Sequence, residues 1–179
     1  MTPWQQHVEK WSTCTDCDAC RNRNKVVLFR GSIPNSILFV GEAPGPSENS
    51  IGKVFCGPAG KLLDELIEKA FEGRQNVKYG LTNLVACLPQ GDERRKFGEP
   101  TDDSIKACQP RLVECIELCQ PKVIIAVGKL AEKWLPKITK VKIVPIIHPA
   151  AILRCDLSQR GLAELRTVTT LRDVVENLK

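Results

Sequence analysis

Four short apolar runs, separated by helical patterns, constrain the fold of this chain more than any other feature. The runs cover residues 36–40, 80–87, 122–128 and 141–147. Strands with continuous apolar runs are covered on both faces, as in a parallel sheet with helices on either side. The repeated order of strand and helix therefore predicts an α/β fold, with three αβα layers around a central, mainly parallel, four-stranded sheet.

The helices between these runs are predicted from apolar spacing and capping residues. After Pro58, apolar side chains recur at helical spacing until Gly73. Thr101 is a hydroxyl cap followed by two acidic residues, so it opens a second helix, in which Pro110 is expected to cause a kink or a break. Further helices are predicted at 130–134 and over most of 158–178, and residues 26–31 are predicted as a strand and turn ahead of the first run.

Polar side chains stand at the ends of three predicted strands. Glu42 follows the first run within the turn 41–45, Asn83 lies in the second run, and His148 follows the last run. Because parallel strands bring their carboxyl ends to one edge of a sheet, we expect these groups to meet there. Phe55 belongs to the glycine-rich loop that continues from the same turn. This edge is the predicted ligand site.

The composition restricts the class of protein. The 179 residues are interpreted as one domain, 1–179, because 42% hydrophobic and 26% charged residues are ordinary for a globular protein. A net charge of +5 permits a polyanionic partner without demonstrating one. No apolar run approaches the ~18 residues of a membrane span, and residues 1–24 lack the apolar region of a signal peptide. We therefore expect a cytoplasmic protein without a membrane partner.

The chain has nine cysteines and no visible export signal, a combination that favours a reducing compartment and metal ligation over disulfides. Cys14-x-x-Cys17 has the spacing that lets two thiolates face one metal centre, and Cys87 and Cys108 are candidates for the remaining ligands. Zinc and an iron–sulfur cluster both accept four thiolates, and Cys20 could replace one ligand. The cysteines interpreted as small buried side chains are Cys115, Cys119 and Cys155.

Six segments, in their order along the chain, resemble a known family. They are Cys14-x-x-Cys17, Gly41-Glu42-Ala43-Pro44-Gly45, Gly52-Lys53-Val54-Phe55-Cys56-Gly57-Pro58-Ala59-Gly60, Thr82-Asn83-Leu84-Val85-Ala86-Cys87, Ala107-Cys108-Gln109-Pro110 and His148-Pro149-Ala150-Ala151-Ile152-Leu153-Arg154. Together they are similar to the family 4 uracil-DNA glycosylases, the iron–sulfur branch of the uracil-DNA glycosylase superfamily. The resemblance implies that superfamily's doubly wound sheet. It also implies a DNA repair enzyme that flips uracil out of DNA and hydrolyses its N-glycosidic bond, leaving an abasic site.

The resemblance also implies roles for individual residues in catalysis and base recognition. Glu42 lies on the loop that positions or activates the attacking water, and His148 stabilises negative charge on the departing uracil. The implied substrate-binding residues are Gly41, Ala43, Phe55 and Asn83, of which Phe55 stacks on the flipped base and Asn83 reads the uracil edge.

Contacts to DNA and a cofactor follow from the same resemblance. Ile152 or Leu153 would be the wedge that fills the gap left by the flipped base, with Arg154 near phosphate. A [4Fe-4S] cluster is implied, with contributions from the cysteine-rich segment 14–20. Its implied ligands are Cys14, Cys17, Cys87 and Cys108. The implied partner is uracil-containing DNA, single- or double-stranded, bound by a monomer.

Two alternatives stay open. Departures from the family pattern, such as Val54 where a proline usually precedes the stacking aromatic, are compatible with a uracil-DNA-binding or altered-specificity relative that has weak or no glycosylase activity. An unrelated nucleotide-handling or redox protein would need a phosphate fingerprint, and no GxxxxGK[ST] pattern occurs. The basic residues 94–96 fit a phosphate contact and a solvated loop equally well. His7 lies in the polar leader and has no predicted role.

Overall fold

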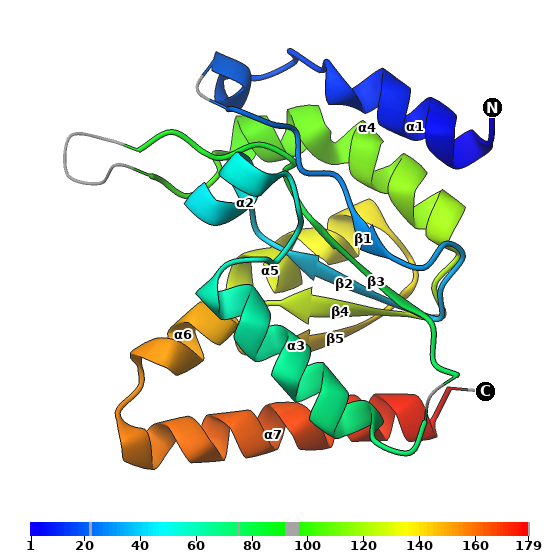
Figure 1. The fold of residues 1–179 in the computed structure, drawn as a ribbon. Coiled ribbons are helices and arrows are strands. Elements are labelled where there is room, and N and C mark those ends of the chain that lie inside the picture. The colour runs from blue at the N-terminus through cyan, green and yellow to red at the C-terminus, as the bar shows by residue number, and fades with distance from the viewer. Residues whose placement is uncertain (22, 75, 92–96, 179) are drawn as a thin grey trace.

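One sheet of five strands forms the centre of the protein (Figure 1), seen in a computed structural model that describes residues 1–21, 23–74, 76–91 and 97–178. The strand order is β1-β3-β2-β4-β5. The strands are β1 (Arg30–Gly31), β2 (Ile37–Gly41), β3 (Tyr79–Asn83), β4 (Val123–Val127) and β5 (Lys142–Ile146). Pairing is parallel between β3 and β2, between β2 and β4, and between β4 and β5. The predicted α/β class and mainly parallel sheet are therefore confirmed.

The predicted number of four strands is wrong by one short edge strand. β1 pairs antiparallel with β3 through two residue pairs, Arg30 with Leu81 and Gly31 with Gly80. Gly31 has a φ of 126°, and a Cβ atom there would clash with the Tyr79 carbonyl oxygen. The strand and turn predicted at residues 26–31 are therefore present in the sheet only as the two residues of β1, and this strand was not counted in the predicted sheet.

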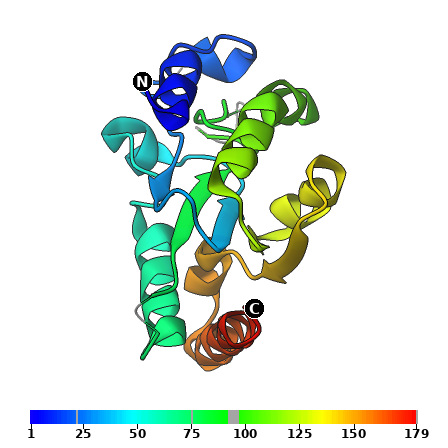
Figure 2. The same cartoon turned by 90° about the vertical axis from the view of Figure 1, so that its right-hand side faces the viewer.

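Helices cover both faces of the sheet, as Figures 1 and 2 show. They are α1 (Pro3–Ser12), α2 (Pro46–Ile51), α3 (Pro58–Phe71), α4 (Asp102–Cys119), α5 (Lys129–Ile138), α6 (Pro149–Arg154) and α7 (Leu157–Glu176), with a 3-10 turn at Asp18–Arg21. In β2, Ile37 and Phe39 pack with α3 and α7, whereas Leu38 and Val40 pack with α4 and α5. This alternation buries both sides of the strand and produces the expected αβα layers.

Three helices differ from their predicted extent. α4 begins after its Thr101 cap, whose Oγ1 accepts from the Ser104 N–H at 3.1 Å, and it continues through Pro110 without a break. The buried face of α4, on both sides of the proline, packs on the sheet and holds the two halves in one helix. The helix predicted at 130–134 extends over Lys129–Ile138, and residues 46–51, predicted as loop, form α2.

The N-terminal leader is a packed helix, so the interpretation of His7 as a residue without a role is wrong. His7 is fully buried. The Glu114 carboxylate on α4 contacts His7 Nδ1 at 3.0 Å and accepts hydrogen bonds from Lys10 Nζ at 2.7 Å and Trp11 Nε1 at 3.1 Å. These contacts fix α1 against α4, so the cysteine-rich segment that follows starts from an anchored point.

Among the described residues, no helix has the length and apolarity needed to cross a membrane.

Candidate active site and cysteine pocket

The carboxyl ends of β2 and β3 bring two of the predicted site residues side by side. Gly41, the last residue of β2, is the register partner of Asn83, the last residue of β3. Glu42 and Ala43 follow directly, and the Gly41 and Glu42 carbonyls accept from the Leu84 and Val85 N–H groups at 2.9 and 3.2 Å. The parallel pairing thus continues beyond the strands and fixes the start of the turn 41–45.

Gly41 is a point of close approach at the site. A Cβ atom on Gly41 would lie 2.5 Å from Asn83 Oδ1 and 2.5 Å from Phe55 Cζ. No Cβ atom tolerates neighbours at that distance, so only glycine allows the amide and the aromatic ring to close over the strand end. The structure therefore brings Phe55 and Asn83 together at Gly41.

Phe55 is held by an unusual backbone conformation. Its φ is 51°, in the left-handed region that non-glycine residues rarely adopt. The Phe55 carbonyl oxygen lies over Gly60, where a Cβ atom would clash with it. The ring is buried, and its centroid lies 6.4 Å from that of His148 with an interplanar angle of 34°. Such strain at a non-glycine residue is typical of functional sites.

Glu48 on α2 holds the Phe55 loop, a role that the sequence analysis missed. Its Oε1 accepts from the Cys56 and Gly57 N–H groups at 2.9 and 2.8 Å, and its Oε2 accepts from the Gly45 N–H at 3.1 Å. One carboxylate thus connects the turn after β2 to the loop that carries Phe55. The available signal was an acidic residue three positions after the helix-capping Gly45, which is a capping-box spacing.

Glu42 is in an environment that disfavours its charge. Burial raises the pKa of the Glu42 carboxyl above its ordinary value of 4.5, and the nearby Glu99 carboxylate adds to the rise. A carboxylate with a raised pKa is a better proton acceptor than a solvated one. Glu42 therefore suits the acceptance of a proton from water.

His148 is held in one neutral tautomer. It caps α6, and its Nδ1 accepts from the Ala150 N–H at 3.1 Å, which leaves Nε2 to carry the proton. Burial lowers the pKa of His148 below 6.5, and the positive charge of Arg154 lowers it further. Gly128 packs against the side chain, since a Cβ atom there would lie 3.0 Å from the His148 Cβ. His148 thus presents a fixed N–H donor at neutral pH.

Asn83 keeps its side-chain amide available. The residue is 2% exposed, and within the described ranges its side chain forms no hydrogen bond. A buried amide without a partner is costly, so a bound ligand is the natural partner for it.

The two candidate wedge residues after His148, Ile152 and Leu153, differ in burial. Ile152 is fully buried in the core between α3 and α7. Leu153 is 36% exposed, and Arg154 is exposed at the end of α6. The buried position of Ile152 removes it from contact with DNA, which leaves Leu153 as the wedge candidate. The basic residues 94–96 lie outside the described residues.

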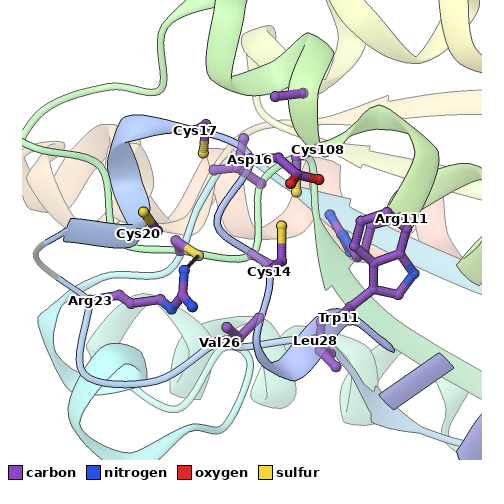
Figure 3. A pocket seen from close by; sticks show the side chains of 14 residues that line it. Trp11, Cys14, Asp16, Cys17, Cys20, Arg23, Val26, Leu28, Cys108 and Arg111 are labelled. Carbon is purple, nitrogen blue, oxygen red and sulfur yellow. Dashed lines mark hydrogen bonds between the residues drawn. The ribbon is translucent and has the colours of Figure 1, made fainter. Parts of the chain in front are cut away.

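Five cysteines line one pocket above the sheet (Figure 3), although they come from distant parts of the chain. They are Cys14, Cys17 and Cys20 from the loop after α1, Cys87 from the segment after β3, and Cys108 from α4. Burial raises the pKa of the Cys14, Cys17 and Cys87 thiols, the last to about 11, and neighbouring Cys108 adds to each rise. The four cysteines predicted as ligands therefore form one electrostatically connected group around Cys108.

Four cysteine thiolates are a donor set that both a zinc ion and an iron–sulfur cluster accept. Within the part of the chain that the structure describes, no three histidine, cysteine or acidic side chains are grouped closely enough to hold one metal ion. In a four-iron cluster each cysteine binds a different iron atom, so the sulfur atoms surround a wider space. The pocket walls are apolar, with Trp11, Val26 and Leu28 beside the thiols, which restricts the access of solvent.

The doubly wound fold, with its polar groups at the carboxyl edge, defines a class of ligand-binding α/β protein. Residues 30–172 match the Uracil DNA glycosylase superfamily. The type-4 uracil-DNA glycosylase of Thermotoga maritima is 34% identical over 82% of this chain and 81% of its own length. That of Sulfurisphaera tokodaii is 32% identical over 81% of this chain and 73% of its own length. The chain belongs to the type-4 uracil-DNA glycosylases.

A solved structure supports the fold alone. The crystal structure of Pedobacter heparinus SMUG2 aligns with a TM-score of 0.59, at 13% identity, over 80% of this chain and 77% of that chain. Similarity of architecture at this identity locates the sheet and its helices, whereas the chemistry has to be argued from the residues at the strand ends.

Proposed function

We propose that this protein is a DNA repair glycosylase that removes uracil from DNA. The observation that carries the proposal is the close approach of Asn83 and Phe55 at Gly41, with His148 beside the Phe55 ring. The three groups are the unbonded amide of Asn83, the ring of Phe55 and the neutral imidazole of His148. An amide that offers a donor and an acceptor, an aromatic face and an N–H donor match the edge, face and carbonyl oxygen of a pyrimidine base.

Base recognition begins with removal of the nucleotide from the stack. A base within a duplex is not accessible, and its rotation into a pocket costs a few kcal/mol of unstacking. Leu153, partly exposed on α6 shortly after His148, is positioned to fill the gap, and Arg154 provides a positive charge for a neighbouring phosphate. In the pocket, Phe55 stacks on the base, and Asn83 bonds to its edge.

Cleavage breaks the bond between the sugar C1′ and the uracil N1, and the electron pair leaves with uracil. The His148 Nε2–H donates a hydrogen bond to the resulting anion, and because the ring is already fixed by Ala150, little reorganisation is needed. Glu42 orients water toward C1′ and accepts its proton. The uracil anion then takes up a proton from solvent while Glu42 releases the one it accepted, so the products are an abasic site and free uracil.

Four cysteines would hold a [4Fe-4S] cluster, namely Cys14, Cys17, Cys87 and Cys108. When bound, the cluster supplies a covalent link between the N-terminal segment, the end of β3 and α4, and hydrolysis of a glycosidic bond requires no electron transfer from it. The proposed partner is uracil-containing DNA, single- or double-stranded, handled by a monomeric cytoplasmic protein.

The test is a base-excision assay on uracil-containing single- and double-stranded oligonucleotides. Wild-type protein is expected to leave alkali-labile abasic sites, and Asn83→Ala, Glu42→Ala and His148→Ala are expected to leave fewer. Equal binding without any cleavage, over a range of salt and temperature, would contradict the enzyme and favour a uracil-DNA-binding protein. A Ser50→Ala variant, altered at an exposed position of α2, is the control for handling.

A further inference from the structure

Arg111 is a buried cation that the proposed reaction does not use. It lies inside α4 and is 1% exposed. Among the described residues it forms no ion pair with an acidic side chain, and its Nε has no hydrogen-bond partner. A buried guanidinium without an opposite charge is strongly destabilising, so the position of Arg111 calls for a counter-charge.

One side of Arg111 holds the end of β3. Its Nη1 donates to Thr82 Oγ1 at 2.9 Å, and its Nη2 donates to the carbonyl oxygens of Asn83 and Leu84 at 2.5 and 2.9 Å. The Thr82 hydroxyl in turn donates to the Leu28 carbonyl at 2.7 Å. The guanidinium therefore fixes the backbone of the residue whose amide faces the base site.

The other side of Arg111 borders the cysteine pocket. Arg111 lines this pocket together with all four proposed cluster ligands, of which Figure 3 labels Cys14, Cys17 and Cys108. Cys108 precedes it by three residues on the same helix, a spacing that places both side chains on one face. Four thiolates around a four-iron core carry a net negative charge, which is the opposite charge that Arg111 lacks among the described residues.

We propose that Arg111 is the buried counter-charge of the cluster and the positioning residue for Asn83. This inference rests on the proposed function, because it assumes both the cluster and the reading of uracil by Asn83. One rigid, planar side chain connects the two: its charge compensates the cysteine site, and its N–H groups hold the carbonyls at the end of β3. Loss of the cluster would leave the guanidinium uncompensated and loosen Asn83.

Three variants of the holoenzyme separate these contributions. Arg111→Met removes the charge and the donors, whereas Arg111→Lys keeps the charge and loses the planar fork. Arg23→Met is the matched control, because Arg23 lies 3.8 Å from Cys87 Sγ but forms no bond to β3. Two quantities are measured for each: the rate at which excess chelator bleaches the cluster absorbance, and the inhibition constant of free uracil.

For Arg111→Met we expect bleaching to be roughly tenfold faster and uracil inhibition to be roughly tenfold weaker, the scale of a lost charge-assisted hydrogen bond. In Arg111→Lys the cluster absorbance should bleach at nearly the wild-type rate, but free uracil should inhibit weakly. Arg23→Met should leave uracil inhibition unchanged.

Wild-type values for Arg111→Met in both measurements would overturn the inference, as would equally fast bleaching of Arg111→Lys and Arg111→Met. If Arg111→Met fails to fold, fast bleaching of Arg111→Lys decides against the inference and wild-type bleaching with weak uracil binding supports it. A wild-type protein without iron or without excision would instead contradict the proposed function, so the two failures are distinguishable.

Discussion

The chemistry at the residue scale depends on how burial shifts the pKa values of Glu42 and His148 in opposite directions. Burial raises the pKa of the Glu42 carboxyl, with a contribution from Glu99, and burial with the Arg154 charge lowers the pKa of His148. Both shifts favour the neutral form, which for His148 is the form that presents Nε2–H alone. The proposed reaction uses the two groups in different protonation states: neutral His148 donates to the leaving uracil, whereas Glu42 is ionised and accepts a proton.

The pH dependence of excision follows from these two shifts. Neutral His148 persists above a pKa that lies below 6.5, and ionised Glu42 persists above a pKa that lies above 4.5. Both requirements are lost as pH falls, so kcat/KM should decline on the acid side, with its midpoint above 4.5, and neither group should produce a decline at high pH. Single-turnover rates measured from acidic to mildly alkaline pH check this. A rate that rises as His148 becomes protonated would contradict the assigned role.

At the scale of elements, α2 and the Phe55 loop act as one unit through Glu48. Three backbone N–H groups, those of Gly45, Cys56 and Gly57, converge on its carboxylate. The left-handed conformation of Phe55 is stable only if the flanking loop is held, and Glu48 connects that loop to the turn after β2.

Glu48→Gln tests this coupling. The neutral amide has one acceptor atom in place of two, so at least one N–H loses its partner, at a cost of about 1.5–3 kcal/mol for a hydrogen bond to a charged group. We expect weaker binding of free uracil, with little change in the far-UV circular dichroism spectrum. The matched control is Glu65→Gln on α3, an exposed position. Equal uracil binding by both variants would show that Glu48 does not position Phe55.

The sequence predicted the helices and strands that have strong hydrophobic periodicity, and it missed the features that depend on tertiary contacts. The placement of Glu42, Asn83 and His148 at one edge of the sheet followed from parallel strand direction alone. The role of Arg111 was not predictable, because a charged residue within a helical pattern is usually solvated, and its burial depends on the cysteine pocket across from it. Ile152 and Leu153 are equally apolar neighbours, and only packing against α3 and α7 distinguishes them.

For the molecule as a whole, the cysteine pocket connects segments that are distant in sequence. Cys14 and Cys17 follow α1, Cys87 follows β3, and Cys108 belongs to α4. Trp11, Leu28 and Ala86 form a small apolar cluster beside these cysteines, and the contacts of α1 with Glu114 anchor only the start of the segment 14–20. Metal binding would therefore contribute directly to the stability of this part of the fold.

Comparison of Cys17→Ser with Cys20→Ser tests the ligand assignment. Cys17 is electrostatically linked to both Cys108 and Cys87, whereas Cys20 is linked to Cys17. Cys17→Ser should lose iron and unfold at a lower temperature, while Cys20→Ser should keep wild-type iron content and Tm. Iron analysis and thermal unfolding are the measurements. Retention of iron in Cys17→Ser, together with its loss in Cys20→Ser, would show that Cys20 and not Cys17 is the ligand.

The most direct measurement is the single-turnover rate of uracil release from a single-stranded oligonucleotide by wild type, His148→Ala and Glu42→Gln. Removal of a preorganised donor to the departing anion should lower the rate by about a hundredfold or more. Glu42→Gln should cause a smaller loss, because bond cleavage precedes the need for an activated water. Wild-type release of uracil with this ordering is the predicted result. Absence of release by wild type, or an unchanged rate in His148→Ala, would contradict it.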